Sequence, residues 1–126
     1  MSYIYEDAES LWKLPTVGTK QCVALIKQYT KAPAASLWKE GETVKGNLTL
    51  KKGTAIATFV GGKYQSLKTG NHAAFYLSQD ASGILVVDQW SGSGTIQKRR
   101  LTFRGKDKSG AFIQPSNNGD AFSVIE

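Results

Sequence analysis

The chain contains very few of the residues from which disulfides and metal sites are built. One cysteine and one histidine occur among its 126 residues. A single cysteine excludes an internal disulfide, and this pair cannot complete a tetrahedral metal site without several carboxylates. The glycine pair at 61–62 lacks the lysine pattern of a phosphate-binding loop. We therefore expect neither a metal nor another cofactor.

Long hydrophobic runs are also absent. No segment approaches the length of a membrane span. Residues 1–12 (MSYIYEDAESLW) are acidic and contain no apolar stretch of signal-peptide length. A Sec-type export route is therefore not indicated by the sequence, and we expect no signal peptide and no membrane insertion. The length predicts one globular domain over residues 1–126, large enough to bury its own core.

Positive charge is in excess, because 16 lysines and arginines face 10 acidic residues and give a net charge of +6. This balance favours anionic partners such as nucleic acid, anionic lipid or acidic cell-wall polymers. The basic residues are scattered, with small clusters at 51–52 and 98–100. The alternation of residues 96–104 places the second cluster partly on the solvated face of a strand. We interpret the excess as a soluble basic surface and expect no nucleic-acid partner.

The pattern is helical in the first third of the chain and strand-like afterwards. Helices are predicted over residues 5–14 and 20–31, with Thr19 as a possible N-cap of the second, and residues 34–41 could add one helical turn. Strands are predicted over residues 54–60, 71–79, 83–90, 95–104 (an outer strand) and 121–126. The turn-rich sequence DASG predicts that the second and third strands form a hairpin. This order of elements indicates an α+β fold with N-terminal helices packed on an antiparallel sheet.

Cys22 falls at the first turn of the predicted helix, where a thiol is placed to ionise. A free thiol titrates near ~8.5, and a helix N-terminus together with an imidazolium can bring its pKa below neutrality. A lone cysteine is more often a buried small apolar residue. The position of Cys22 is therefore informative only together with other groups.

Two such groups lie in the predicted hairpin. His72 starts its first strand, and Asp88 lies near the end of its second strand. With the hairpin centred on Asp80 or Ala81, His72 lies opposite Asp88 or one diagonal step from it, and both cases place the two side chains on one face. A helix packed on that face could present Cys22 to His72. The three residues would then supply a nucleophile, a base and an orienting carboxylate.

Four segments carry a resemblance to a known family: GTKQCVALIKQY, LWKEGETV, KKGTAIATF and GNHAAFYLSQDASGILVVDQW. Over residues 15–104 the chain resembles the CHAP and NlpC/P60 superfamily of papain-like peptidoglycan peptidases. It is most similar to the small type VI secretion amidase effectors, in particular their third family. The resemblance implies a papain-like α+β domain. The tail after Arg104 carries no motif that we can place.

The resemblance also implies roles for individual residues. Cys22 matches the nucleophile, His72 the base, and Asp88 the polar third member. Gln21 matches the glutamine that often precedes the nucleophile and helps to shape the oxyanion site. The family often has Glu-x-Asn at the third position, where this chain has DQW. Whether Asp88 or Gln89 orients His72 therefore stays open.

The loop over residues 61–71 leads directly into His72, and we expect it to border a substrate groove. Tyr64 and Lys68 are candidates for substrate contact, Lys68 by pairing with a carboxylate. Trp90 is a candidate wall of the same groove.

By resemblance, the substrate is a peptide of the bacterial cell wall. The bond would be either the γ-D-glutamyl–diaminopimelate bond or the diaminopimelate–D-alanine cross-link, and the third effector family would favour the cross-link. The resemblance further implies a protein that is made in the cytoplasm and injected into a rival's periplasm by the type VI secretion apparatus. It also implies an immunity protein that blocks the groove. Two alternatives stay open: a phage or housekeeping endolysin domain, and a non-catalytic basic binding module on the same fold.

Overall fold

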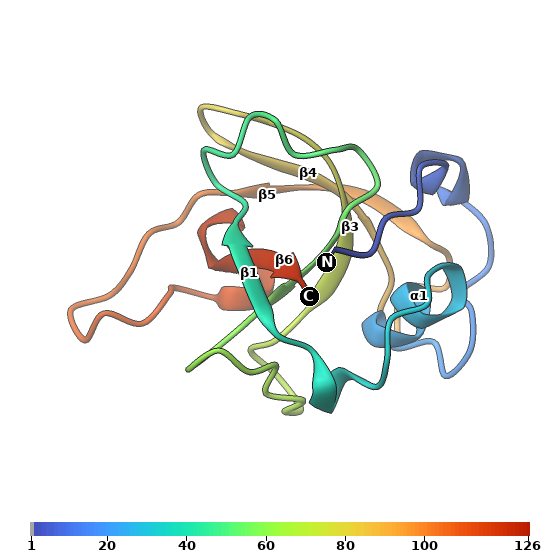
Figure 1. The fold of residues 1–126 in the computed structure, drawn as a ribbon, viewed down its shortest axis with the longest axis horizontal. Coiled ribbons are helices and arrows are strands. Elements are labelled where there is room, and N and C mark those ends of the chain that lie inside the picture. The colour runs from blue at the N-terminus through green and yellow to red at the C-terminus, as the bar shows by residue number, and fades with distance from the viewer. Residues whose placement is uncertain (1) are drawn as a thin grey trace.

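A six-stranded antiparallel sheet is the central feature of the computed structural model, which describes residues 2–126 (Figure 1). Its strands are β1 (Glu40–Thr43), β2 (Ala55–Thr58), β3 (Ala73–Asp80), β4 (Gly83–Asp88), β5 (Gln97–Thr102) and β6 (Phe122–Ile125). They lie in the order β1-β6-β2-β3-β4-β5, so the last strand of the chain is inside the sheet and β5 is at an edge. The predicted antiparallel sheet and the outer position of β5 are confirmed.

Helical structure is scarcer than the sequence indicated. Within residues 2–126 there is one α-helix, α1 (Cys22–Tyr29). The other helical elements are the short 3-10 turns η1 (Ala8–Leu11), η2 (Ala35–Leu37), η3 (Pro115–Asn117) and η4 (Gly119–Ala121). The helix predicted over residues 5–14 is wrong in length, because a segment this short is not stable as an isolated helix and Lys13 has a left-handed φ of 77°. No helix in the described part is long and apolar enough to cross a membrane.

The helix that carries the cysteine begins two residues later than predicted. Gly18 and Lys20 both have left-handed backbone conformations, with φ of 58° and 71°, and a right-handed helix cannot run through them. Gln21, with an extended backbone, is the N-cap in place of Thr19. Cys22 is therefore the first residue of α1.

Strand β1 was not predicted from the sequence. Its residues, EGET, show no apolar alternation, and they form a strand because Glu40 pairs with Ile125 and Thr43 with Ser123 of β6. Pairing with a neighbour can outweigh weak local strand preference. The tail after Arg104 thus has a structural role, since it supplies β6 to the interior of the sheet.

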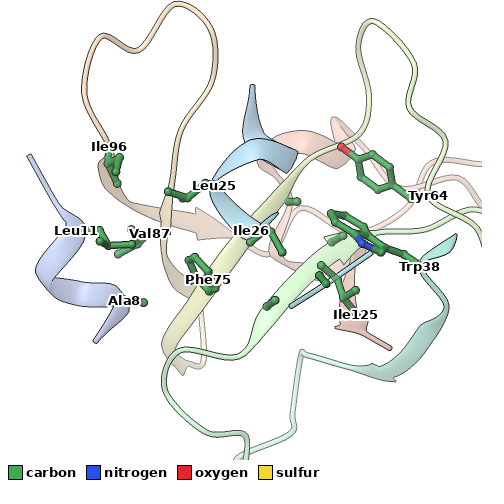
Figure 2. Packing of buried hydrophobic residues seen from close by; sticks show 14 of the residues in the cluster. Ala8, Leu11, Leu25, Ile26, Trp38, Tyr64, Phe75, Val87, Ile96 and Ile125 are labelled. Carbon is green, nitrogen blue, oxygen red and sulfur yellow. The ribbon is translucent and has the colours of Figure 1, made fainter. Parts of the chain in front are cut away.

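The two faces of the sheet carry separate hydrophobic clusters. On one face, Leu25 and Ile26 of α1 pack with Phe75 of β3 and Val87 of β4 (Figure 2). The other face carries Ile56, Ala74, Val86, Leu101 and Phe122. Burial of one such aliphatic side chain contributes about 1.5–3 kcal/mol. The first cluster therefore fixes α1 against β3.

A β-bulge in β3 sets the register of the β3–β4 hairpin. Near the turn Asp80 pairs with Gly83, whereas beyond an irregularity in the middle of β3, Phe75 pairs with Val87. The bulge places one extra residue in β3. Because side chains alternate with a period of two, this one residue changes which later side chains of the two strands share a face.

His72 and Asp88 share a face as a result. The register beyond the bulge places Asp88 one diagonal step from His72, which is the second of the two registers predicted. The register near the turn, continued without the bulge, would have put the two side chains on opposite faces.

Candidate active site

A buried imidazole and a buried carboxylate meet at the end of β3 and β4. His72 Nε2 lies 2.7 Å from Asp88 Oδ2, and the two residues are 6% and 0% exposed. The backbone N–H of His72 donates to Thr58 Oγ1 at 3.0 Å, and its ring meets Phe122 edge-on. Since Asp88 occupies Nε2, the ring nitrogen Nδ1 is left to face Cys22.

The Cys22 thiol lies against this imidazole. Its sulfur is close enough to His72 for the imidazole to lower the pKa of the thiol, and Tyr64 Oη lies 3.4 Å from Sγ. One expectation was wrong: α1 packs on the face that carries Phe75, not on the face of His72. The contact is made at the end of the sheet, because Cys22 begins α1 and His72 immediately precedes β3.

The electrostatics favour the charged forms of both groups. Burial alone would raise the pKa of the Cys22 thiol, but the hydrogen bond and the charge of His72 hold this pKa below its usual value. Burial alone would lower the pKa of His72, but its hydrogen bonds to Asp88 and Cys22 raise this pKa to about 9. Both directions stabilise a thiolate beside an imidazolium near neutral pH.

Tyr64 is buried and fixed beside the thiol. Its ring packs against Trp38 with centroids 5.1 Å apart (Figure 2), and its hydroxyl accepts a hydrogen bond of 3.4 Å from Asn71 Nδ2. Burial and the neighbouring Cys22 raise the pKa of the Tyr64 hydroxyl. The hydroxyl therefore keeps its proton and can donate to a thiolate.

A groove of about 450 Å³ opens beside Cys22. Its walls include Gln21, Val23, Tyr64, Leu67, Lys68, Asn71 and Trp90. An adjoining hollow of about 450 Å³ shares Lys68, His72 and Trp90 and reaches Arg99 and Asn117. The structure thus brings the sequence candidates Gln21, Tyr64, Lys68 and Trp90 together around the thiol. No group of three or more His, Cys, Asp or Glu side chains in residues 2–126 is arranged to hold a metal ion.

Gln89 is directed away from His72. Its fully buried side-chain amide accepts from the Val17 N–H at 2.9 Å and donates to the carbonyl oxygens of Val17 and Gln21 at 3.0 and 2.8 Å. The side chains of Asp88 and Gln89 therefore bind different parts of the chain, although the two residues are adjacent in sequence. Asp88 is the residue that contacts His72, and Gln89 holds the segment that leads into α1.

Sequence reasoning missed Arg99, which it had assigned to a basic surface cluster. The Nε and Nη2 atoms of Arg99 lie 3.0 and 2.6 Å from Asp88 Oδ2. In the β4–β5 pairing, Arg99 is opposite Val86 and therefore shares a face with Asp88. Only the register of β5 could have revealed this, and the turn-rich connection between Trp90 and β5 left that register open.

A thiol, an imidazole and a buried carboxylate in series beside an open groove form the arrangement that cysteine hydrolases use. Residues 7–125 match the family described as Domesticated amidase effector 2, and the chain belongs to this family. It is 42% identical over 133 residues to the "Type VI secretion amidase effector 2 protein" of Salmonella typhi, with 100% of both chains covered. It is 35% identical over 116 residues to "Domesticated amidase effector 2" of Ixodes scapularis, covering 87% of this chain and 73% of that protein.

The fold is also shared with a solved structure. The chain matches a structure titled "Type 6 secretion amidase effector 2 (Tae2)" with a TM-score of 0.92 at 40% identity, covering 98% of this chain and 94% of the other. The family match extends well past Arg104, so the tail belongs to the family's domain although it showed no motif. The predicted similarity to type VI amidase effectors is confirmed, whereas the finer assignment to their third family is not.

Proposed function

We propose that this chain is a peptidoglycan amidase that uses Cys22 as its nucleophile, with residues 1–126 forming one catalytic domain of papain-like, NlpC/P60 or CHAP type. The observation that carries the proposal is the series Cys22–His72–Asp88, in which a thiol with a lowered pKa faces a groove. Membership of an amidase effector family supports the same reaction class.

The chemistry follows from the positions of these groups. The Cys22 thiolate attacks the carbonyl carbon of the scissile amide and forms a C–S bond. The oxyanion accepts hydrogen bonds from the Cys22 N–H and the Gln21 side chain. The C–N bond breaks as the His72 imidazolium gives its proton to the leaving amine. Neutral His72 then deprotonates a water, which attacks the thioester, releases a carboxylic acid and restores the thiolate.

The substrate in this proposal is a diaminopimelate-containing stem peptide of the cell wall. Either the γ-D-glutamyl–diaminopimelate bond or the diaminopimelate–D-alanine cross-link is cut. The names of the relatives support delivery by a type VI secretion apparatus. The chain is then made in the cytoplasm and acts in the periplasm of a target bacterium, and an immunity protein that fills the groove protects the producing cell.

Mass spectrometry of muropeptides tests this function. Purified protein is incubated with peptidoglycan fragments beside the Cys22→Ala variant. Release of the diaminopimelate-containing end from uncrosslinked stem peptides, which leaves a stem ending in D-glutamate, indicates cleavage of the γ-D-glutamyl bond. Conversion of cross-linked dimers to monomers with intact stems indicates cleavage of the cross-link. Binding to the fragments without any new amino terminus would overturn the proposal in favour of a non-catalytic binding module.

The loss of Asp88 is expected to be graded. Asp88→Asn keeps the shape of the side chain but removes the charge that supports the His72 imidazolium. The analogous change in a serine protease lowers kcat by ~10⁴, and a cysteine enzyme should lose less because a thiol ionises more readily. We expect a loss in kcat/KM on the order of 10 to 10³-fold, which corresponds to about 1.4–4 kcal/mol in the barrier.

Gln89→Ala is the matched comparison for this prediction. It removes three hydrogen bonds near α1, so we expect a lower melting temperature. The contact between His72 and Asp88 should persist in this variant. Wild-type activity in Asp88→Asn together with an inactive but folded Gln89→Ala would show that Gln89 is the third member.

Lys68 is expected to contribute to substrate binding. It lies exposed on loop 61–71 and lines both hollows, where its ammonium can pair with a substrate carboxylate. Lys68→Ala should raise KM by about 3- to 10-fold, because a charged hydrogen bond at an exposed rim contributes little more than this. Lys63→Ala, in the same loop but outside the groove lining, is the control. Equal KM values for the two variants would assign substrate binding to Trp90 instead.

A further inference from the structure

The carboxylate of Asp88 has a second charged partner besides His72. Arg99 Nη2 and Nε lie 2.6 and 3.0 Å from Oδ2, and Nε lies 3.2 Å from Oδ1. Asp88 is fully buried, and a buried carboxylate is costly unless other groups compensate its charge and fill its lone pairs. Arg99 provides both the compensating charge and a second set of hydrogen bonds.

Arg99 is itself held in place. Its guanidinium carbon lies 4.6 Å from the centroid of the Trp90 ring, and Nη1 donates to Asn117 Oδ1 at 3.2 Å. Its side chain is 27% exposed, so it reaches from the adjoining hollow to the buried carboxylate. Two walls of that hollow, Trp90 and Asn117, thus fix the guanidinium.

We propose that Arg99 is a positioning residue for the amidase reaction, fixing the orientation of Asp88 and offsetting part of its charge so that His72 can release its proton. The inference rests on the proposed thiol mechanism. Asp88 with its charge uncompensated would bind the imidazolium more strongly, and a more strongly bound proton is transferred less readily to the leaving amine. A carboxylate without the two-pronged contact to Arg99 would also be free to turn away from Nε2.

The charged and titratable groups around His72 set the pKa of its imidazole, and this pKa sets the alkaline limb of the activity profile. Cys22 of α1 and Asp88 of β4 act on it directly, and Arg99 of β5 acts through Asp88. Tyr64 and Lys68 of loop 61–71 line the same groove as His72. Removal of a nearby positive charge raises the pKa of an imidazolium. Loss of the Arg99 charge should therefore move the alkaline limb of the activity profile to higher pH.

The test compares Arg99→Gln, Arg99→Lys and Arg100→Gln on a defined muropeptide, with kcat and KM measured from pH 5 to 10. Arg100 pairs with Asp80 at the exposed end of the hairpin, so Arg100→Gln makes the same change in net charge away from the site. Arg99→Gln should lower kcat by about 10- to 100-fold and move the alkaline limb upward by roughly one pH unit. Arg99→Lys should keep the position of the limb and lose part of kcat, because lysine retains the charge but not the two-pronged geometry.

A purely structural Arg99 would give a different result. Arg99→Gln would then melt at a lower temperature but, when folded, show the kcat and the alkaline limb of Arg100→Gln. If Arg99→Gln does not fold, Arg99→Lys decides, and full kcat in that variant overturns the inference. Wild type and Cys22→Ala are measured in parallel: an inactive wild type contradicts the proposed function, whereas an active wild type with Arg99 variants equal to Arg100→Gln contradicts this inference alone.

Discussion

Cys22→Ala is expected to lower muropeptide hydrolysis by on the order of 10⁴-fold or more, because no other group could form the covalent intermediate. The fold should persist, since the change removes one partly buried sulfur and should alter the free energy of unfolding by about 1 kcal/mol or less. The measurement is kcat/KM on a defined muropeptide, with thermal melts as the control for folding. Hydrolysis at more than a few per cent of the wild-type rate in a folded Cys22→Ala variant would exclude Cys22 as the nucleophile.

His72→Ala should produce the second large loss, about 10³- to 10⁴-fold in kcat/KM. General acid–base catalysis accounts for about 10²- to 10⁴-fold, and the variant also loses the partner that ionises the thiol. In the wild type, activity should rise with pH through the lowered pKa of Cys22. It should fall again as His72, whose pKa is raised to about 9, loses the proton needed by the leaving amine.

The shape of the pH profile separates a catalytic histidine from a structural one. The alkaline limb near the pKa of His72, about 9, should disappear in His72→Ala, whereas Asp88→Asn should retain it at lower pH because the partner that raises this pKa has lost its charge. An unchanged alkaline limb in His72→Ala would mean that another group donates the proton. Thermal melts of each variant control for loss of the buried hydrogen bond to Asp88.

The alternation of side chains along a strand is enough to predict that His72 and Asp88 share a face, but only if the hairpin has the register that was assumed. The hairpin turn alone would have placed the two side chains on opposite faces, and the bulge in β3 restores the shared face. No residue in that stretch signals a bulge, because its sequence, AFYLS, fits a regular strand equally well. The sequence therefore predicted the contact between His72 and Asp88 correctly but did not predict the bulge that produces it.

Contacts that depend on distant segments were harder to predict. The pairing of β1 with β6 joins residues 80 or more positions apart, and weak strand sequences such as EGET become strands only through such partners. Gln89 holds the segment before α1 across a similar distance in sequence. The role of Arg99 depends on the register of β5, so its charge appeared to belong to the solvated surface.

The start of the helix was predicted to within two residues because its signals are local. A lone cysteine beside a glycine-containing turn and an apolar helical pattern marked the position, although the left-handed backbone of Lys20 moved the first residue to Cys22. The choice between Asp88 and Gln89 required the structure, because both have hydrogen-bonding side chains and only their faces differ. Side-chain direction in a strand follows the register, and the register was set by the bulge.

The rate at which iodoacetamide alkylates Cys22 at different pH values shows whether His72 holds this residue as a thiolate. Intact-protein mass spectrometry follows the reaction from pH 5 to 9 in wild type and His72→Ala. At pH 6 we expect the wild-type thiol to react faster than free cysteine and His72→Ala to remove this advantage. A wild-type rate that follows the ionisation of a free thiol, with a midpoint near ~8.5, and that is unchanged by His72→Ala would contradict this expectation.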